Sequence, residues 1–408
     1  MRQVDIYIEQ NWEKTIKPAT QDNGTLIGLP KPFSTPCISG VFQELFYWDT
    51  YFTNVGLLAS GRAEQAQNNI ENMFYLIDRF GWMPNGSRTY YKNRSQPPFL
   101  SQMVKELWLC TQDNTWLKEK AYPALIKEYH YWQTLRMTPT GLNRYAGTDP
   151  DDATLEEYGQ MLCERFGMDI PESMGLLRSY GEALLSVAES GWDCTSRFRT
   201  KPHQYNPVDQ NALLYLLESN MELFATELKM EDDTNLWQQR KRERRERMDS
   251  ILWNEKLSYY CDYQFVEKHQ SDLFSVASFY PLFAGMCDAD RAAKIVANLP
   301  KIEMQYGIAC CENREDLLNL QWDYPNGWAC LQYIVVQALL RYGYTEDAHR
   351  IAEKFVDVIE RNFEKTGNLW EKYNVCTGEV SISKEYETPP MKGWTAGIYV
   401  AFRKLLQA

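Results

Sequence analysis

The sequence predicts a mostly α-helical protein, and three observations lead to that prediction. Apolar residues recur at helical spacing in segments spread along the whole chain. Convincing strand alternation is scarce. No Gly/Ser-rich or Pro-rich linker divides the 408 residues. We therefore expect a single domain over residues 1–408, with residues 1–30 as an N-terminal extension packed on it.

The first expected helices lie in the N-terminal two thirds of the chain. Residues 63–77 carry an apolar stripe that stops at Gly81, a residue typical of the C-cap of a helix. Residues 211–224 and 281–286 are also expected to be helical.

Two further helices are expected near the C-terminus. Residues 329–340 form an apolar run that stops before Gly343. Residues 345–359 carry apolar side chains at i, i+3, i+4, i+7 and i+11, with Thr345 as the expected N-cap. Only residues 258–263 alternate well enough to predict a short hairpin arm.

Charge and cysteine usage restrict the functional class. The net charge of −12 argues against nucleic acid and anionic membranes as partners. The basic run at residues 239–247 is interpreted as one solvated helix face. The N-terminus has no apolar secretion segment, and no apolar run approaches the ~18 residues of a membrane span. The ten cysteines show no Cys-x-x-Cys pair, so we expect free thiols and a cytoplasmic location.

The most informative motif is residues 321–328, which read Gln-Trp-Asp-Tyr-Pro-Asn-Gly-Trp. Aromatic faces cover the C–H faces of a pyranose, and carboxylate, amide and indole N–H groups bind its hydroxyls. A surface loop is the bland alternative, but two tryptophans in eight residues are unusual there. The motif therefore predicts a sugar site.

Four other segments also mix aromatic and polar residues at expected helix ends or in loops. They are residues 42–52, 84–98, 189–198 and 369–395. The four histidines have no metal-ligand spacing, and no nucleophile elbow or phosphate-binding glycine loop is present. Neither a metal nor a cofactor is expected. Paired carboxylates with aromatics remain, and these are the groups of a glycosidase.

These segments resemble glycoside hydrolase family 37, the trehalases. Residues 42–52 resemble the first family signature, and residues 321–328 match the second almost completely. Shorter matches lie at residues 84–98, 190–193 and 371–373, in the order that the family has them. The resemblance implies an (α/α)6 toroid and an inverting mechanism, with Asp193 as general acid and Glu371 as general base. In an inverting enzyme these two carboxyls stand roughly 6.5–9.5 Å apart.

The resemblance and the motifs together give a set of expected sugar-binding residues. Trp192 is expected to exclude water from Asp193, and Glu385 and Trp394 belong to a lid-like segment in the family. The full set is Phe42, Trp48, Asp49, Asn85, Arg94, Gln96, Glu156, Gly191, Trp192, Gln321, Trp322, Asp323, Asn326, Trp328, Glu385 and Trp394.

The sequence departs from the family at two arginines that contact the substrate. Val41 stands where the first is expected, and the family's Arg-Pro-Glu segment appears at best as Thr154-Leu155-Glu156. The glycine-rich stretch before the lid glutamate is replaced by residues 380–384. The loss of a charge-assisted hydrogen bond costs ~1.5–3 kcal/mol, so specificity is less firmly predicted than chemistry.

Four functional hypotheses follow. The leading one is an inverting glycosidase that cleaves α,α-trehalose to glucose. An α-glucosidase of the same fold, acting on a different disaccharide or glucoside, is the runner-up. A catalytically silent sugar-binding protein is the alternative from another class, and the presence of both carboxylates argues against it. A phosphorylase or transferase is a lesser alternative, since no basic phosphate pocket is evident beside the carboxylates.

Overall fold

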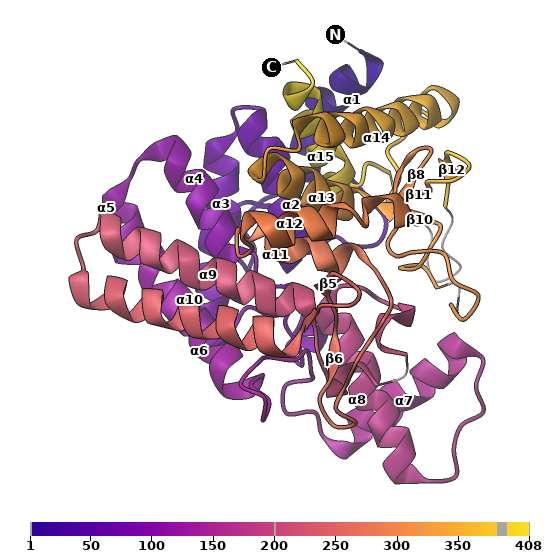
Figure 1. Cartoon of the computed structure of the whole chain (residues 1–408). Helices are drawn as coiled ribbons and strands as arrows, with labels where there is room; N and C mark the ends of the chain where they lie inside the picture. Colours follow the sequence, from indigo (N-terminus) through magenta and orange to yellow (C-terminus); the bar gives the residue numbers. More distant parts are fainter. Residues whose placement is uncertain (1, 200, 319, 382–389, 408) are drawn as a thin grey trace.

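The computed structural model describes residues 2–199, 201–318, 320–381 and 390–407 (Figure 1). Helices dominate these residues, which confirms the mostly helical prediction. The helices are α1 Gln3–Asn11, α2 Tyr47–Ala59, α3 Ala63–Phe80, α4 Leu100–Thr111, α5 Asn114–Trp116, α6 Tyr122–Leu135, α7 Asp152–Phe166, α8 Met174–Ser190, α9 Val208–Glu227, α10 Glu231–Ile251, α11 Tyr280–Phe283, α12 Ala289–Val296, α13 Ala329–Arg341, α14 Thr345–Thr366 and α15 Gly393–Leu405.

Six helices form a closed circuit at the centre of the molecule. α2 contacts α4, α4 contacts α9, α9 contacts α11, α11 contacts α13, α13 contacts α15, and α15 returns to α2. α2, α9 and α13 are buried nearly all round, as helices in the middle of a large core are. α3, α10 and α14 lie outside them, and α3 and α14 bury one face only.

Strands are short and lie in the connections between helices. They are β1 Ile16–Lys17, β2 Phe33–Ser34, β3 Tyr205–Asn206, β4 Trp253–Asn254, β5 Tyr259–Tyr260, β6 Tyr263–Gln264, β7 His269–Gln270, β8 Glu303–Met304, β9 Gly307–Ile308, β10 Asn326–Trp328, β11 Lys372–Asn374 and β12 Glu379–Val380. The β4–β5 hairpin confirms the arm expected at residues 258–263.

The predicted helices occur, with two corrections at their ends. Gly81 caps α3 with φ +88°, as expected. Thr345 is the first residue of α14 rather than its N-cap, because Tyr344 occupies the cap position without a side-chain hydrogen bond. The helix expected at residues 281–286 covers only α11, and Gly285, with φ +71°, follows shortly after it.

The N-terminal residues pack on the main core. Val4 and Ile8 of α1, and Trp12 after it, are buried in the same hydrophobic cluster as the central helices. Both chain ends lie beside α14 and α15 in Figure 1. The boundary of an extension at residue 30 stays a prediction.

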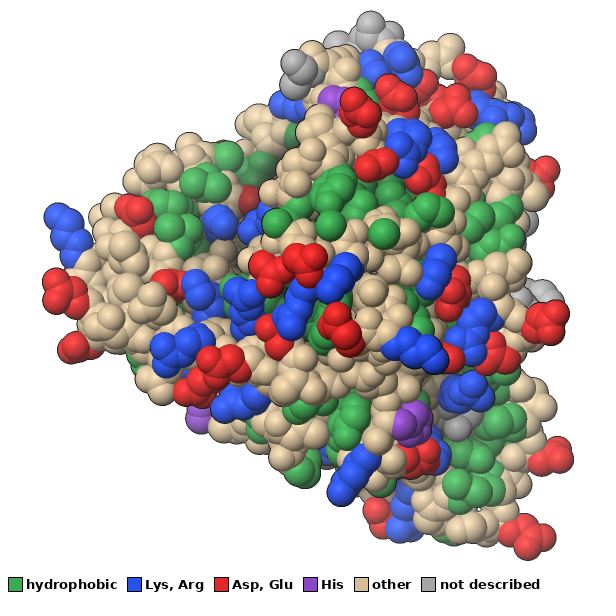
Figure 2. Space-filling model, in the orientation of Figure 1, with side chains coloured by type: hydrophobic (Ala, Val, Ile, Leu, Met, Phe, Trp, Pro, Cys, Tyr) green, Lys and Arg blue, Asp and Glu red, His purple; other side chains and the backbone are tan. Residues whose placement is uncertain are grey.

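The basic run on α10 is not a single solvated face, which corrects that interpretation. Arg244 is buried between α10 and α9, where its Nε donates to Glu218 Oε1 at 2.9 Å. Lys241 pairs with Glu222 of α9, and Arg247 pairs with Glu243 one turn away. Figure 2 shows blue and red side chains interspersed over α9 and α10. These acidic partners neutralise the run.

Candidate active site

One pocket collects most of the sequence-predicted residues. Its volume is about 270 Å³, and aromatic, amide and charged side chains line it in roughly equal measure. Such a mixture is typical of small-molecule sites. The lining residues are Phe42, Phe46, Trp48, Asp49, Asn85, Tyr91, Arg94, Gln96, Tyr158, Met161, Arg165, Leu184, Ala188, Gly191, Asp193, Trp322, Trp328, Glu371, Lys392 and Trp394.

The start of α2 supplies one side of the pocket. Trp48 and Asp49 lie in its first turn, where the backbone N–H groups have no partner within the helix. The side chain of Gln96 satisfies one of them, because its Oε1 accepts from Trp48 N at 3.1 Å. The N–H of Asn85 donates to Arg94 O at 2.9 Å, and the carbonyl of Asn85 accepts from Tyr47 N at 3.1 Å. Three distant segments are therefore joined by their backbones.

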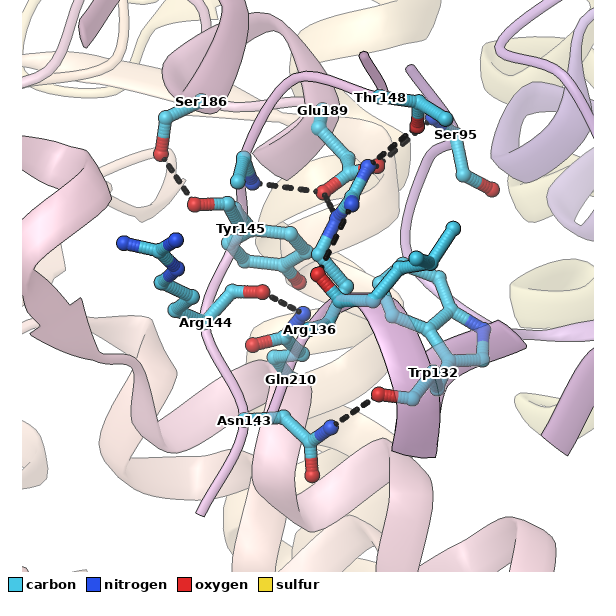
Figure 3. A network of polar contacts seen from close by, with 12 residues as sticks. Ser95, Trp132, Arg136, Asn143, Arg144, Tyr145, Thr148, Ser186, Glu189 and Gln210 are labelled. Carbon is cyan, nitrogen blue, oxygen red and sulfur yellow. Dashed lines mark hydrogen bonds and ion pairs between the residues drawn. The ribbon is translucent and has the colours of Figure 1, made fainter. Parts of the chain in front are cut away.

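A buried ion pair fixes the segment that carries Arg94 and Gln96. Arg136 donates through Nε to Glu189 Oε2 and through Nη2 to Glu189 Oε1, both at 2.7 Å. Glu189 Oε1 also accepts from the backbone N–H of Ser95 at 2.8 Å. Figure 3 shows this pair at the centre of a larger polar network. Glu189 lies on α8 four residues before Asp193, so the ion pair connects two walls of the pocket.

The loop that carries Asp193 follows α8 directly. Gly191 ends the helix with φ +72°, and a Cβ at this position would lie 2.6 Å from Trp48 Cε2. Only glycine fits both the left-handed backbone and the close approach of the indole. Asp193 is half-buried at the pocket wall.

Two buried carboxylates hold the next residues of this loop. Asp323 accepts from the backbone N–H of Ser196 at 2.8 Å and from its hydroxyl at 2.5 Å. Arg197 donates to Asp209 of α9 and to Asp262, each at 2.8 Å. The motif at residues 321–328 is thus tied to the Asp193 loop. Burial raises the pKa of Asp323, and the hydrogen bonds from Ser196 counter that shift.

A small antiparallel sheet brings Glu371 to the same pocket. β10 pairs with β11 so that Trp328 lies opposite Lys372 and Gly327 opposite Tyr373. Glu371 immediately precedes β11 and is 4% exposed. Trp328 in turn stacks on Trp322, with ring centroids 3.8 Å apart. The paired strands therefore place Glu371 beside the tryptophans of the most informative motif.

Lys392 joins the carboxylates of the site. Its Nζ lies 3.3 Å from Glu371 Oε1 and 3.4 Å from Asp49 Oδ1. The ammonium also lies 4.6 Å from the ring centroids of both Phe42 and Trp394. Burial by itself lowers the pKa of Lys392, but the two carboxylates outweigh it and raise the pKa above its usual value. Lys392 is therefore a fixed positive charge at the pocket wall.

Eleven of the expected sugar-binding and catalytic positions share this pocket with Phe42. They are Trp48, Asp49, Asn85, Arg94, Gln96, Gly191, Asp193, Trp322, Trp328, Glu371 and Trp394. The structure brings them together from α2, α15, β10 and the intervening loops.

Five expected residues lie outside the pocket lining. Trp192 is fully buried, with the Arg197 guanidinium 4.4 Å from its ring, and the carboxylate of Glu156 accepts from Arg178 Nε at 2.9 Å. Gln321 accepts through its carbonyl from Trp328 Nε1, Asp323 binds Ser196, and Asn326 accepts from Ser381 Oγ. These contacts are within the protein, so the residues support the site from behind. Glu385 lies outside the described residues.

Sequence reasoning missed several lining residues. Lys392 carries the strongest charge among them, and its place two residues before Trp394 was a usable signal. Tyr158, Met161 and Arg165 come from α7, a helix with no motif to mark it. Only their helical spacing connects them.

No cluster of metal-ligating side chains occurs among the described residues. The helices in that same part of the chain include none with the length and apolar character that crossing a membrane requires. All ten cysteines are described, and each is a free thiol, as expected.

Comparison with known proteins places the chain in a family. The sequence pattern described as "Trehalase" matches residues 1–407. The periplasmic trehalase of Xanthomonas axonopodis pv. citri is 33% identical over 422 residues, which cover 96% of this chain and 71% of that protein. The periplasmic trehalase of Pseudomonas aeruginosa is 31% identical over 94% of this chain and 72% of that protein.

A solved structure gives the same result for the fold. The neutral trehalase of Saccharomyces cerevisiae superposes with a TM-score of 0.77 and 27% identity, over 92% of this chain and 73% of that one. The similarity confirms the predicted (α/α)6 toroid, to which the closed circuit of six helices corresponds.

The comparisons overturn the predicted cytoplasmic location. The bacterial relatives are named periplasmic trehalases. The prediction was wrong because it relied on the first residues and on unpaired cysteines, and neither determines the compartment.

Proposed function

The chain belongs to the trehalase family, and from that premise we propose that it hydrolyses α,α-trehalose to two glucose molecules with inversion. The observation that carries the proposal is a single pocket lined by Asp193, Glu371 and tryptophan rings. Two carboxyls and an aromatic wall are the groups that an inverting glycosidase uses on a pyranose.

Asp193 acts as the general acid and Glu371 as the general base. Asp193 protonates the glycosidic oxygen while the bond to the anomeric carbon breaks. Glu371 takes a proton from a water whose oxygen attacks that carbon from the opposite face. The attacked glucose leaves as the β anomer and the other glucose as the α anomer, so one trehalose and one water give both products.

The surroundings of the two carboxyls support these roles. Glu371 lies 3.3 Å from the ammonium groups of both Lys372 and Lys392, and these favour the charged form that a base needs. Asp193 is half-buried between Trp192 and Cys194, both of which are buried. Partial burial favours the protonated form that an acid needs.

Hydrolysis of a different α-glucoside is the second candidate. Glu156, at the nearest match to the family's Arg-Pro-Glu segment, binds Arg178 instead of lining the pocket. Val41 is 45% exposed and also lies outside the lining. Both positions concern the identity of the sugar rather than the chemistry.

Glucose release from trehalose and from a panel of α-linked glucosides tests the proposal. We expect trehalose to be cleaved fastest, with a β and an α anomer appearing together in early NMR spectra. Two α anomers in those spectra would contradict inversion. Preference for another glucoside would keep the mechanism and reject trehalose as the substrate.

The Asp193→Asn variant separates the acid from the rest of the site. Removal of a general acid lowers turnover ~10²–10⁴-fold, so trehalose cleavage should fall by that factor. Turnover of α-glucosyl fluoride should change far less, because fluoride leaves without protonation. Near-parental cleavage of trehalose would remove Asp193 from the acid role.

A further inference from the structure

One face of α7 forms a wall of the pocket. Tyr158, Met161 and Arg165 all line it, and their i, i+3, i+7 spacing places them on the same side of the helix. Leu184 and Ala188 of α8 line it beside them, at i, i+4 spacing. Figure 1 shows α7 and α8 as neighbouring helices at the edge of the molecule.

This wall lies on the side of the proposed acid. Arg165 Nη1 is 3.8 Å from the Sγ of Cys194, the residue that follows Asp193. Glu371, by contrast, is held with Asp49 by Lys392, which belongs to the C-terminal part of the chain. In an inverting hydrolase the acid touches the oxygen of the leaving half, and the base lies across the bond. The α7 face therefore borders the space for the leaving sugar.

The α7–α8 hairpin is a distinct packing unit. It has its own small hydrophobic cluster, made by Leu162, Ala183, Leu184 and Val187 and separate from the main core. Arg178 of α8 pairs with Asp152 and Glu156 of α7, at 2.8 and 2.7 Å. The segment nearest to the family's Arg-Pro-Glu is thus used to close the hairpin, and the charge that reaches the pocket from α7 comes from Arg165 at its other end.

We propose that Arg165 is the specificity-determining residue for the leaving half of the substrate, to whose hydroxyls its guanidinium donates hydrogen bonds. Met161, one turn before it, supplies the apolar surface beneath that sugar, and Tyr158 continues the wall towards Arg94, whose Nη1 lies 3.2 Å from the Tyr158 hydroxyl. The inference rests on the proposed hydrolysis and concerns one half of the substrate only.

The test compares a disaccharide with a substrate that has no second sugar. We would measure kcat/KM of Arg165→Gln and Arg165→Lys for trehalose and for α-glucosyl fluoride. Loss of a charge-assisted hydrogen bond gives a ~10- to 100-fold decrease for trehalose in Arg165→Gln. The fluoride should be hydrolysed within about threefold of the parent, and Arg165→Lys should fall between the two for trehalose.

Arg178→Gln is the matched control, since it removes an arginine from the same hairpin that does not line the pocket. It should leave the ratio of the two substrates unchanged. An equal decrease for both substrates in Arg165→Gln, or no decrease for either, would overturn the inference. A parent enzyme that cleaves the fluoride but prefers another glucoside to trehalose rejects the proposed substrate, and the same comparison then tests Arg165 with that glucoside.

Discussion

At the scale of single residues, the site depends on a lysine buried among carboxylates. Lys392 contacts Asp49 and Glu371 through charge, and Phe42 and Trp394 through their rings. Burial raises the pKa of Asp49, and the Lys392 ammonium opposes that rise. The lysine therefore keeps a desolvated pair of carboxylates ionised where the proposed base must accept a proton.

Replacement of this lysine should move the acidic limb of the activity profile. In Lys392→Met the carboxylates lose their ammonium partner, so the pKa of Asp49 rises further and protons bind at higher pH. Activity should then be lost at a higher pH as the solution is acidified, and kcat should fall at every pH. Profiles of kcat from acidic to neutral pH measure the shift. An unchanged acidic limb would show that Lys392 has no influence on the titrating group.

At the scale of elements, close helix contacts and a short sheet position the site. β10 and β11 unite two segments that lie far apart in the sequence. In the α7–α8 hairpin, a Cβ on Gly159 would lie 2.1 Å from Leu177 O, and one on Gly181 would lie 2.0 Å from Leu155 O. The backbones approach so closely only because both positions are glycine.

Gly181→Ala should displace α7 and disturb the wall that it forms. The added methyl cannot coexist with a carbonyl oxygen at 2.0 Å, so the two helices must separate. We expect kcat/KM for trehalose to fall more than for α-glucosyl fluoride, and amide exchange to rise in α7 and α8 but not in α9. Gly175→Ala is the control in the same helix, because its Cβ would meet no atom closer than 3.8 Å. Equal behaviour of the two variants would contradict the argument.

At the scale of the whole molecule, the core contains charged groups that make stability depend on pH. Glu128 of α6 is 1% exposed and accepts a hydrogen bond from the Tyr47 hydroxyl. Burial raises its pKa from the model-compound value of 4.5 to about 7, and the bond from Tyr47 only partly opposes this. The folded protein therefore holds a proton on Glu128 that the unfolded chain has already released.

The pH dependence of unfolding should show this proton. Between pH values of about 4.5 and 7 the native state binds more protons, so the free energy of unfolding falls as pH rises and levels off above about 7. Glu128→Gln removes this loss, about 1–3 kcal/mol. Thermal unfolding at acidic and at mildly basic pH should therefore differ less in the variant than in the parent. Glu119→Gln, at an exposed position, should keep the parental dependence.

The amino-acid sequence by itself determined the helical class, the sugar-binding chemistry and the family resemblance. Helical spacing of apolar residues is a local property, so α3, α13 and α14 were predictable. The motifs around Trp48, Asp193, Trp322 and Glu371 combine residue types that suit a sugar site, and the structure places all four in one pocket.

Only the tertiary structure decided which predicted residues face the pocket and which lie behind it. Asp323 and Trp322 are neighbours in one motif, yet the tryptophan lines the pocket and the aspartate holds the Asp193 loop. Arg165 and Lys392 reach the pocket from helix α7 and from the residue before α15, where no motif marks them. A side chain's direction depends on how distant helices pack against one another, and that packing is not encoded in any short stretch of sequence.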